Sequence, residues 1–375
     1  MSGRSLERAS ASIEPEPKTG SPIVPTSKPL RKKGKQKGVL VFLVIALISV
    51  VLLSLSLGAV SISPGQAVVI LASKLGIAMP VSFQDQQAIV LWSIRLPRII
   101  AGCLIGAGLA IAGAAMQGLF RNPLADPGLV GVSSGAALGA VLILVLGSSL
   151  SIPAGSFGLV PSAAFAGALL IAGLVHRLSL REERTVVSTL LLAGIAFNAL
   201  CGAGVGLLTF VATDAQLRSV TFWSLGSIGG VTWTSVAWLA PLTLIPAWAI
   251  HSQRRILNAL LLGEAEAGHL GFHVENGKRI ILICTTLIVG ATVSFSGIIG
   301  FVGLVVPHLL RLWIGPDHRF LLAGSALLGA LLLVLADTAA RIVVMPAELP
   351  IGIVTALCGA PFFLWLLKRE SGHLS

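Results

Sequence analysis

The chain has 375 residues, of which 55% are hydrophobic and only 11% are charged. Soluble domains carry about 25% charged residues, so this composition excludes an ordinary soluble protein and indicates a polytopic membrane protein. The formal net charge is +11, and residues 1–38 supply +6 of it from nine Lys or Arg and three Glu. Because nearly all the cations flank apolar segments, the basic character does not indicate a nucleic-acid partner.

Residues 1–38 are predicted to be a disordered cytoplasmic tail. They contain five Pro and a basic run from Arg31 to Lys37, and such a segment buries too little apolar surface to offset the entropy lost on ordering. Residues 39–60 follow without a charge and are long enough to span a bilayer. Since cytoplasmic loops carry an excess of Lys and Arg, the basic run places the N-terminus in the cytoplasm.

Ten apolar segments are predicted to span the membrane, in an all-α membrane domain over residues 39–368 with a short tail over 369–375. Residues 67–78 are interrupted by Lys74 and are too short to cross, so they are predicted to form a helix on the outer surface. Both termini are then cytoplasmic, and 21 Lys or Arg lie inside against five outside, as the positive-inside rule requires. The predicted spans are residues 39–60, 96–119, 129–147, 158–177, 186–211, 234–250, 280–294, 298–314, 320–342 and 349–367.

The sequence lacks the motifs of several enzyme classes. No phosphate-binding loop of the form Gly-x-x-x-x-Gly-Lys-Ser/Thr occurs, so the chain is not expected to hydrolyse ATP itself. Cys103, Cys201, Cys284 and Cys358 stand apart, without the spacing of a metal site or a disulfide framework. Asp337 is the main intramembrane acid, which argues against a proton relay. If the chain moves a solute, the energy is expected to come from another subunit.

A polar turn from Arg121 to Pro127 follows a helix rich in small residues, and Gly128 to Gly135 then resume an apolar segment. Non-helical backbone at membrane depth must be buried in protein or line a wet cavity. The alternative is an ordinary cytoplasmic connection between two helices.

The longest cytoplasmic loop, residues 251–279, is predicted to contain a short helix. Its acids lie near the helix start and Gly271 suits a C-terminal stop. The helix carries Leu beside Ala and Gly, which is a surface that another protein could bind. The alternative is a loop helix packed only on its own bundle.

Three of the five cations predicted on the outer side, against the topology rule, are Arg95, Arg98 and Arg341. One explanation is an acidic partner whose docking they would steer. The other is pairing within the chain, since Asp337 and Arg341 have the i,i+4 spacing of neighbours on a helix. Arg95 and Arg98 have no acid nearby in the sequence, which favours docking for these two.

These segments, in this order, resemble the permease subunits of ABC importers for ferric siderophores, haem and vitamin B12. The similarity covers roughly residues 60–368 and leaves out the N-terminal tail. It is carried by the blocks Arg95-Leu-Pro-Arg98, Gln117-Gly118, Arg121-Asn-Pro-Leu-Ala-Asp-Pro127, Leu191-Leu-Ala-Gly194, Leu262-Gly-Glu264, Gly300-Phe-Val-Gly-Leu-Val-Val-Pro-His308, Asp317-His318-Arg319 and Glu348-Leu-Pro-Ile-Gly352 through Pro361.

The resemblance implies a bundle of about ten transmembrane helices like that of vitamin B12 importers, in the bacterial inner membrane. It implies no enzymatic activity and no covalently bound cofactor in this chain, with ATP and magnesium held by partner subunits. The implied partners are a second copy of the chain, two cytoplasmic ATP-binding subunits, an external binding protein and the lipid bilayer.

The resemblance also assigns roles to three sets of residues. Arg95, Arg98 and Arg341 would meet glutamates of the binding protein, and Asn198 and Arg218 would lie along the translocation pathway. The loop over residues 251–279 would transmit motion from the ATP-binding subunits through Leu262, Gly263, Glu264, Ala267, Leu270 and Gly271.

Haem is the preferred substrate, because residues 190–198 and 214–227 look most like the corresponding segments of haem permeases. Ferric siderophores and cobalamin stay as alternatives. His308 belongs to the pattern that the family shares, so a structural role is expected for it. A secondary transporter would need paired intramembrane acids and helices broken in matching halves, and a membrane enzyme would need a catalytic constellation; neither is evident in the sequence.

Overall fold

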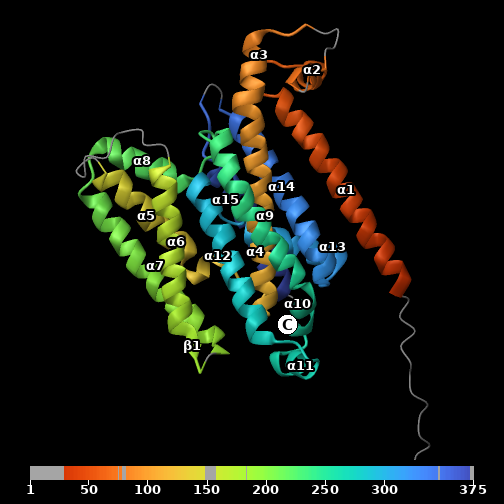
Figure 1. Ribbon diagram of the computed structural model, residues 1–375, viewed down its shortest axis with the longest axis vertical. Coiled ribbons are helices and arrows are strands. Elements are labelled where there is room, and N and C mark those ends of the chain that lie inside the picture. The colour runs from red at the N-terminus through yellow and green to blue at the C-terminus, as the bar shows by residue number, and fades with distance from the viewer. Residues whose placement is uncertain are drawn as a thin grey trace, which may run out of the picture.

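Long apolar helices run side by side through most of the molecule (Figure 1). The computed structural model describes residues 29–74, 76–77, 82–147, 158–182, 184–344 and 347–371. In this part of the chain the secondary structure is helical apart from one short pair of strands, which confirms the predicted all-α fold.

Among the described residues, seven helical runs are long and apolar enough to cross a membrane, and three shorter apolar helices accompany them. They match the ten predicted segments one for one, because uninterrupted apolar runs separated by polar turns leave little freedom in counting spans. The seven runs are α1 (Pro29–Ser56), the continuous run of α3 (Asp85–Ile89), η1 (Val90–Arg95) and α4 (Leu96–Leu119), then α6 (Leu159–Ser179), α7 (Val187–Phe210), α9 (Trp233–Ser252), α12 (Val274–Ser296) and α14 (His318–Ile342). The three shorter helices are α5 (Val132–Leu146), α13 (Val302–Ile314) and α15 (Ile351–Ser371).

The remaining elements lie at the two ends of the bundle (Figure 1). At the end called here the α2 face are α2 (Pro64–Lys74), which matches the predicted surface helix, and α8 (Asp214–Leu225). At the opposite α11 face are α11 (Glu264–His269), α10 (Arg254–Leu260) before it, and the strands β1 (Leu180–Arg181) and β2 (Arg184–Thr185). A 3-10 turn, η2 (Pro127–Val130), precedes α5.

The predicted tail ends earlier than residue 38. Helix α1 begins at Pro29, so the basic run from Arg31 to Lys37 belongs to its first turns. Residues 1–28 of the predicted N-terminal tail and residues 372–375 of the predicted C-terminal tail lie outside the described residues.

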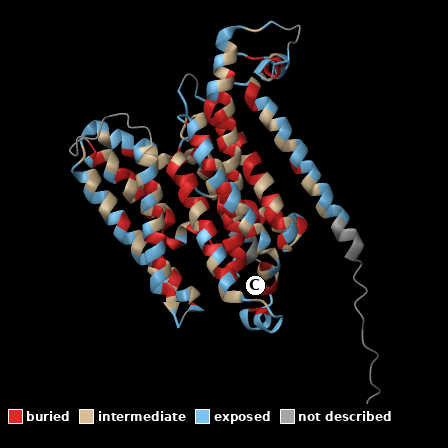
Figure 2. Ribbon diagram, in the orientation of Figure 1, coloured by how far each residue is buried: buried red, intermediate tan, exposed pale blue. Residues whose placement is uncertain are grey.

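Helix α4 is the centre of the bundle, and glycines bring its backbone against two neighbours. A Cβ atom on Gly106 would collide with the carbonyl oxygen of Gly329 in α14, and one on Gly113 would collide with that of Gly303 in α13. Small residues permit such close approach between helices in a membrane. Buried residues accordingly concentrate on α4, α12 and α14, whereas few of the described residues of α1 and α7 are buried (Figure 2).

Candidate functional site

A cluster of buried charges joins α4 to α14 near the α2 face. The Arg98 guanidinium lies 2.8 Å from the Asp337 carboxylate, and its Nη1 donates to Glu348 at 2.9 and 3.0 Å. Arg341 Nε lies 3.2 Å from the same Asp337 carboxylate, which is the i,i+4 pair that the sequence allowed. The Glu348 side chain is about half exposed (48%), whereas the Arg98, Asp337 and Arg341 side chains are buried.

The third arginine, Arg95, binds the end of α1. Its guanidinium donates to the backbone carbonyl oxygens of Leu55, Ser56 and Val60. The last carbonyl groups of a helix have no partner within the helix, and a cation near them is stabilising. Arg341 reaches the same place, because its Nη2 donates to Ser54 Oγ at 2.7 Å. Arg95 and Arg341 therefore fasten the α2-face end of α1.

All three predicted docking arginines thus have partners within the chain. A carboxylate of an external protein could reach Arg98 most readily at the Glu348 side, since Glu348 is the exposed member of the cluster. The partners of Arg98 are not evident from local spacing, because Asp337 and Glu348 lie more than 200 positions from it in the sequence.

The predicted coupling segment divides into an exposed and a buried set. Leu262 and Leu270 are 66% and 60% exposed, and Leu261 beside them is 44% exposed. Gly263 adopts a φ of 129°, which L side chains rarely adopt, and it connects α10 to α11. Ala267 is fully buried and packs α11 onto the bundle. Gly271 ends the segment with a φ of 82°.

A buried lysine holds α11 in place. Lys278 of α12 has its ammonium group 2.5 Å from the Glu264 carboxylate and 3.7 Å from that of Glu275. Glu275 in turn accepts a hydrogen bond of 2.6 Å from the backbone N–H of Thr185 in β2. Buried charges need such partners to offset their desolvation. The sequence alone did not single out Lys278, although its i,i+3 spacing from Glu275 is typical of a pair on one helix.

The two predicted pathway residues lie on different elements. Asn198 in α7 accepts a hydrogen bond from Ser134 Oγ at 2.5 Å and donates one to the Gly128 carbonyl at 3.4 Å. It therefore fastens α7 to the segment formed by η2 and α5. Arg218 is exposed on α8.

The polar turn before α5 returns into the protein. Asp126 begins η2 and accepts a hydrogen bond of 2.7 Å from the Gly128 N–H. Burial raises the pKa of the Asp126 carboxyl above its ordinary value, and the Gly128 N–H partly offsets this rise. A Cβ atom on Gly194 of α7 would collide with the Leu129 carbonyl, so η2 packs tightly against α7. Arg121 to Leu124 at the start of the turn are exposed, whereas Ala125, Pro127 and Val130 are buried, so the turn is a connection between two helices whose second half packs into the protein.

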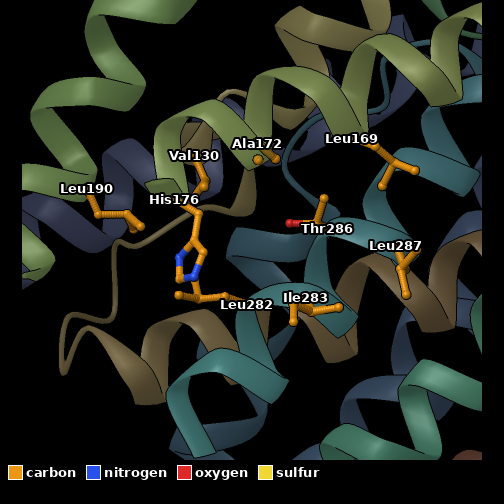
Figure 3. A pocket seen from close by; sticks show the side chains of 10 residues that line it. Val130, Leu169, Ala172, His176, Leu190, Leu282, Ile283, Thr286 and Leu287 are labelled. Atoms are coloured by element: carbon orange, nitrogen blue, oxygen red, sulfur yellow. The ribbon is translucent and has the colours of Figure 1, made fainter. Parts of the chain in front are cut away.

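One cavity of about 170 Å³ lies between η2, α6, α7 and α12 (Figure 3). Its lining is apolar apart from His176 and Thr286. Pockets that hold small molecules measure about 300–1,000 Å³, so this cavity is too small for a metal chelate the size of haem.

Comparison with known proteins agrees with this architecture. The sequence pattern of the FecCD transport family matches residues 45–369. The hemin transport system permease protein HmuU of Yersinia pestis is 45% identical over 329 residues, which are 88% of this chain and 95% of that protein. The cobalamin import system permease protein BtuC of Halobacterium salinarum is 44% identical over 299 residues, or 79% of each chain. A solved chain, described as an inward-facing conformation of a metal-chelate type ABC transporter, aligns with a TM-score of 0.77 at 32% identity. That alignment covers 89% of this chain and 99% of the solved one.

Proposed function

Because the chain belongs to the FecCD transport family, whose members are permease subunits of importers for metal chelates, haem and vitamin B12, we propose that it carries haem into the cytoplasm. One observation favours haem over the other cargoes. The alignment with the Yersinia pestis hemin permease extends over more of both chains than the alignments with cobalamin permeases.

We propose that two ATP-binding subunits dock on the α11 face. The exposed Leu262 and Leu270 offer apolar contacts there. Glu264, in the same segment, forms an ion pair with the Lys278 ammonium group. The absence of a phosphate-binding loop from the sequence supports a separate source of ATP hydrolysis.

The working unit is proposed to be a homodimer that packs through α7 in the bacterial inner membrane, with both termini cytoplasmic. Only Leu190, Gly194 and Cys201 of α7 are buried, and no atom lies within 4 Å of a Cβ placed on Gly202 or Gly206. Small residues on an open helix face permit close approach of a second helix. A pathway between two copies, near Asn198, would also account for the small size of the enclosed cavity.

The external binding protein is proposed to dock on the α2 face through Arg95, Arg98 and Arg341. Since these side chains have partners within the chain, docking would require an exchange in which acids of the binding protein replace Glu348 on Arg98. Arg218 on α8 is an exposed cation at the same face and is proposed to guide an anionic substrate to the pathway.

The test uses proteoliposomes that contain the permease assembled with its ATP-binding subunits and are supplied with the external binding protein. Haem, ferrichrome and cyanocobalamin are offered separately, with and without internal ATP. ATP-dependent uptake of haem alone is the expected result. Uptake of ferrichrome or cyanocobalamin without haem would replace the proposed cargo. Uptake that is independent of ATP and stops when an ionophore dissipates the ion gradient would overturn the ATP-driven mechanism and indicate a secondary transporter.

A further inference from the structure

A hydrogen-bonded junction joins α10, which directly precedes α11, to the start of α14. Asn258 Oδ1 in α10 accepts from the backbone N–H of His318 at 2.9 Å and lies 2.9 Å from His318 Nδ1. Asn258 Nδ2 donates to Asp317 Oδ1 at 2.8 Å, and the same carboxylate oxygen accepts from the Arg319 N–H at 3.0 Å. The first N–H groups of a helix have no hydrogen-bond partner within the helix. At the start of α14, Asn258 and Asp317 together accept hydrogen bonds from these groups.

The junction also reaches α4. His318 is 1% exposed, and a Cβ atom placed on Gly118 would lie 2.5 Å from His318 Nε2 and 3.0 Å from Leu257 Cδ2. The end of α4, the start of α14 and α10 thus meet at one point with no space between them. Well-packed contacts of this kind do not compress, so a displacement of α10 must displace its neighbours.

From this point α4 and α14 continue together across the bundle. Their backbones touch where Gly106 meets Gly329. At the far end of the pair, Arg98 is bound to Asp337 at 2.8 Å. The same two helices therefore bear the α10 junction at the α11 face and the arginine cluster at the α2 face.

We propose that Asn258 is a positioning residue through which movement of α10 and α11 is passed to the α4–α14 pair, and so to the arginine cluster at the opposite face. The inference rests on the proposed function, because it supposes that a partner at the α11 face drives that movement. Asn258 is suited to the role because it is half-buried, lies one turn before the exposed Leu261 and Leu262, and binds α14 through both atoms of its amide.

The test is an exchange of the two side chains. Asn258→Asp places a second carboxylate against Asp317, and two carboxylates at this distance repel. Asn258→Asp combined with Asp317→Asn restores one donor facing one acceptor, and Asn is as good a helix cap as Asp. Asn258→Ser is a second, neutral variant whose short side chain cannot bridge the two helices. The control is Asn276→Asp, which makes the same chemical change outside the junction, because Asn276 is exposed at the start of α12.

The measured quantity is the amount of cargo transported per ATP hydrolysed in the proteoliposomes described above. The cargo is whichever of haem, ferrichrome and cyanocobalamin the wild type transports. Asn258→Asp and Asn258→Ser are expected to lower this ratio about tenfold while ATP hydrolysis continues. The exchanged pair is expected to recover most of it, and Asn276→Asp is expected to match the wild type. A purely structural role would instead lower transport and hydrolysis together and leave their ratio constant.

An unchanged ratio in both Asn258 variants would overturn the inference, as would a ratio that the exchanged pair does not restore. These outcomes are distinct from a failure of the proposed function, which would show as a wild type without ATP-dependent uptake of any of the three compounds.

Discussion

Arg98 and Asp337 form a buried ion pair of 2.8 Å between helices α4 and α14, and both side chains are at most 6% exposed. The Asp337 carboxylate also faces Arg341 at 3.2 Å, so one acid is shared by two cations. Glu348 supplies the second negative charge from the surface. The two positive and two negative charges of this cluster are thus balanced within the chain, and removal of Asp337 takes the shared partner from both Arg98 and Arg341.

Asp337→Ala is expected to destabilise the permease strongly. The substitution strips Arg98 and Arg341 of their shared buried partner, and breaking a buried pair costs about 3–5 kcal/mol of the free energy of unfolding. Thermal unfolding of the purified protein in detergent measures the effect. Asp214→Ala, at the exposed start of α8, is the control and should cost less than about 1 kcal/mol. Equal midpoints for the two variants would contradict the role given to Asp337.

Glu348→Gln is expected to strengthen docking of the binding protein. The neutral amide frees the outward side of Arg98 for an acid of the partner, and the gain should be about threefold in affinity at low salt. It should fade as added salt screens the charges. Titration of labelled binding protein against the permease in nanodiscs gives the affinity. Glu182→Gln, on the α11 face, should change nothing, and weaker docking by Glu348→Gln would count against the exchange at Arg98.

Lys278→Met is expected to uncouple α11 from the bundle. The methionine fills the buried space but cannot bind Glu264 and Glu275, and the loss of such a buried contact corresponds to about a tenfold drop in uptake. ATP-dependent uptake in proteoliposomes measures it. Lys278→Arg should retain part of the activity, and the exposed Arg255→Met should retain all of it. Full uptake by Lys278→Met would show that this lysine does not position α11.

Gly113→Ala is expected to destabilise the bundle, whereas Gly173→Ala is not. The new methyl group at position 113 would collide with the Gly303 carbonyl, and overpacking of this kind costs about 1–3 kcal/mol. At Gly173 in α6 no atom lies within 4 Å, so the change should stay within about 0.5 kcal/mol. Thermal unfolding of the two variants side by side tests this, and similar midpoints would refute close backbone contact between α4 and α13.

The spans could be predicted from the sequence because an apolar run of sufficient length matches the thickness of the hydrocarbon core and therefore indicates a transmembrane helix. Helix α8 was not predicted, because its polar residues interrupt the apolar ones and the segment does not resemble a membrane span. Its capping box was nevertheless readable: Thr213 Oγ1 accepts from the Gln216 N–H, and the Gln216 side chain accepts from the Thr213 N–H.

The candidate sites were predictable only where partners are close in sequence. The pair of Asp337 and Arg341 lies on one helix turn and was anticipated as an alternative. The pair of Arg98 and Glu348 spans 250 positions, and nothing in local spacing indicates it. The exposed leucines of the coupling segment were predicted, but the buried Lys278 was not, because a lysine near a membrane boundary satisfies the topology rule without any partner.

The attachment of α1 has a consequence for the order in which the protein is assembled during synthesis. Among its described side chains only Leu43, Ser54 and Leu55 are buried, and Ser54 is bonded to Thr338 and Arg341 of α14. Helix α1 leaves the ribosome before α14, with most of the other described helices between them. Until then α1 is held by Arg95, by the apolar cluster that contains Leu55 and Leu91, and by Gln36, whose side chain donates to the Ile314 carbonyl of α13. A nascent chain that stops before α14 therefore lacks the two hydrogen bonds to Ser54 that fasten the α2-face end of its first helix.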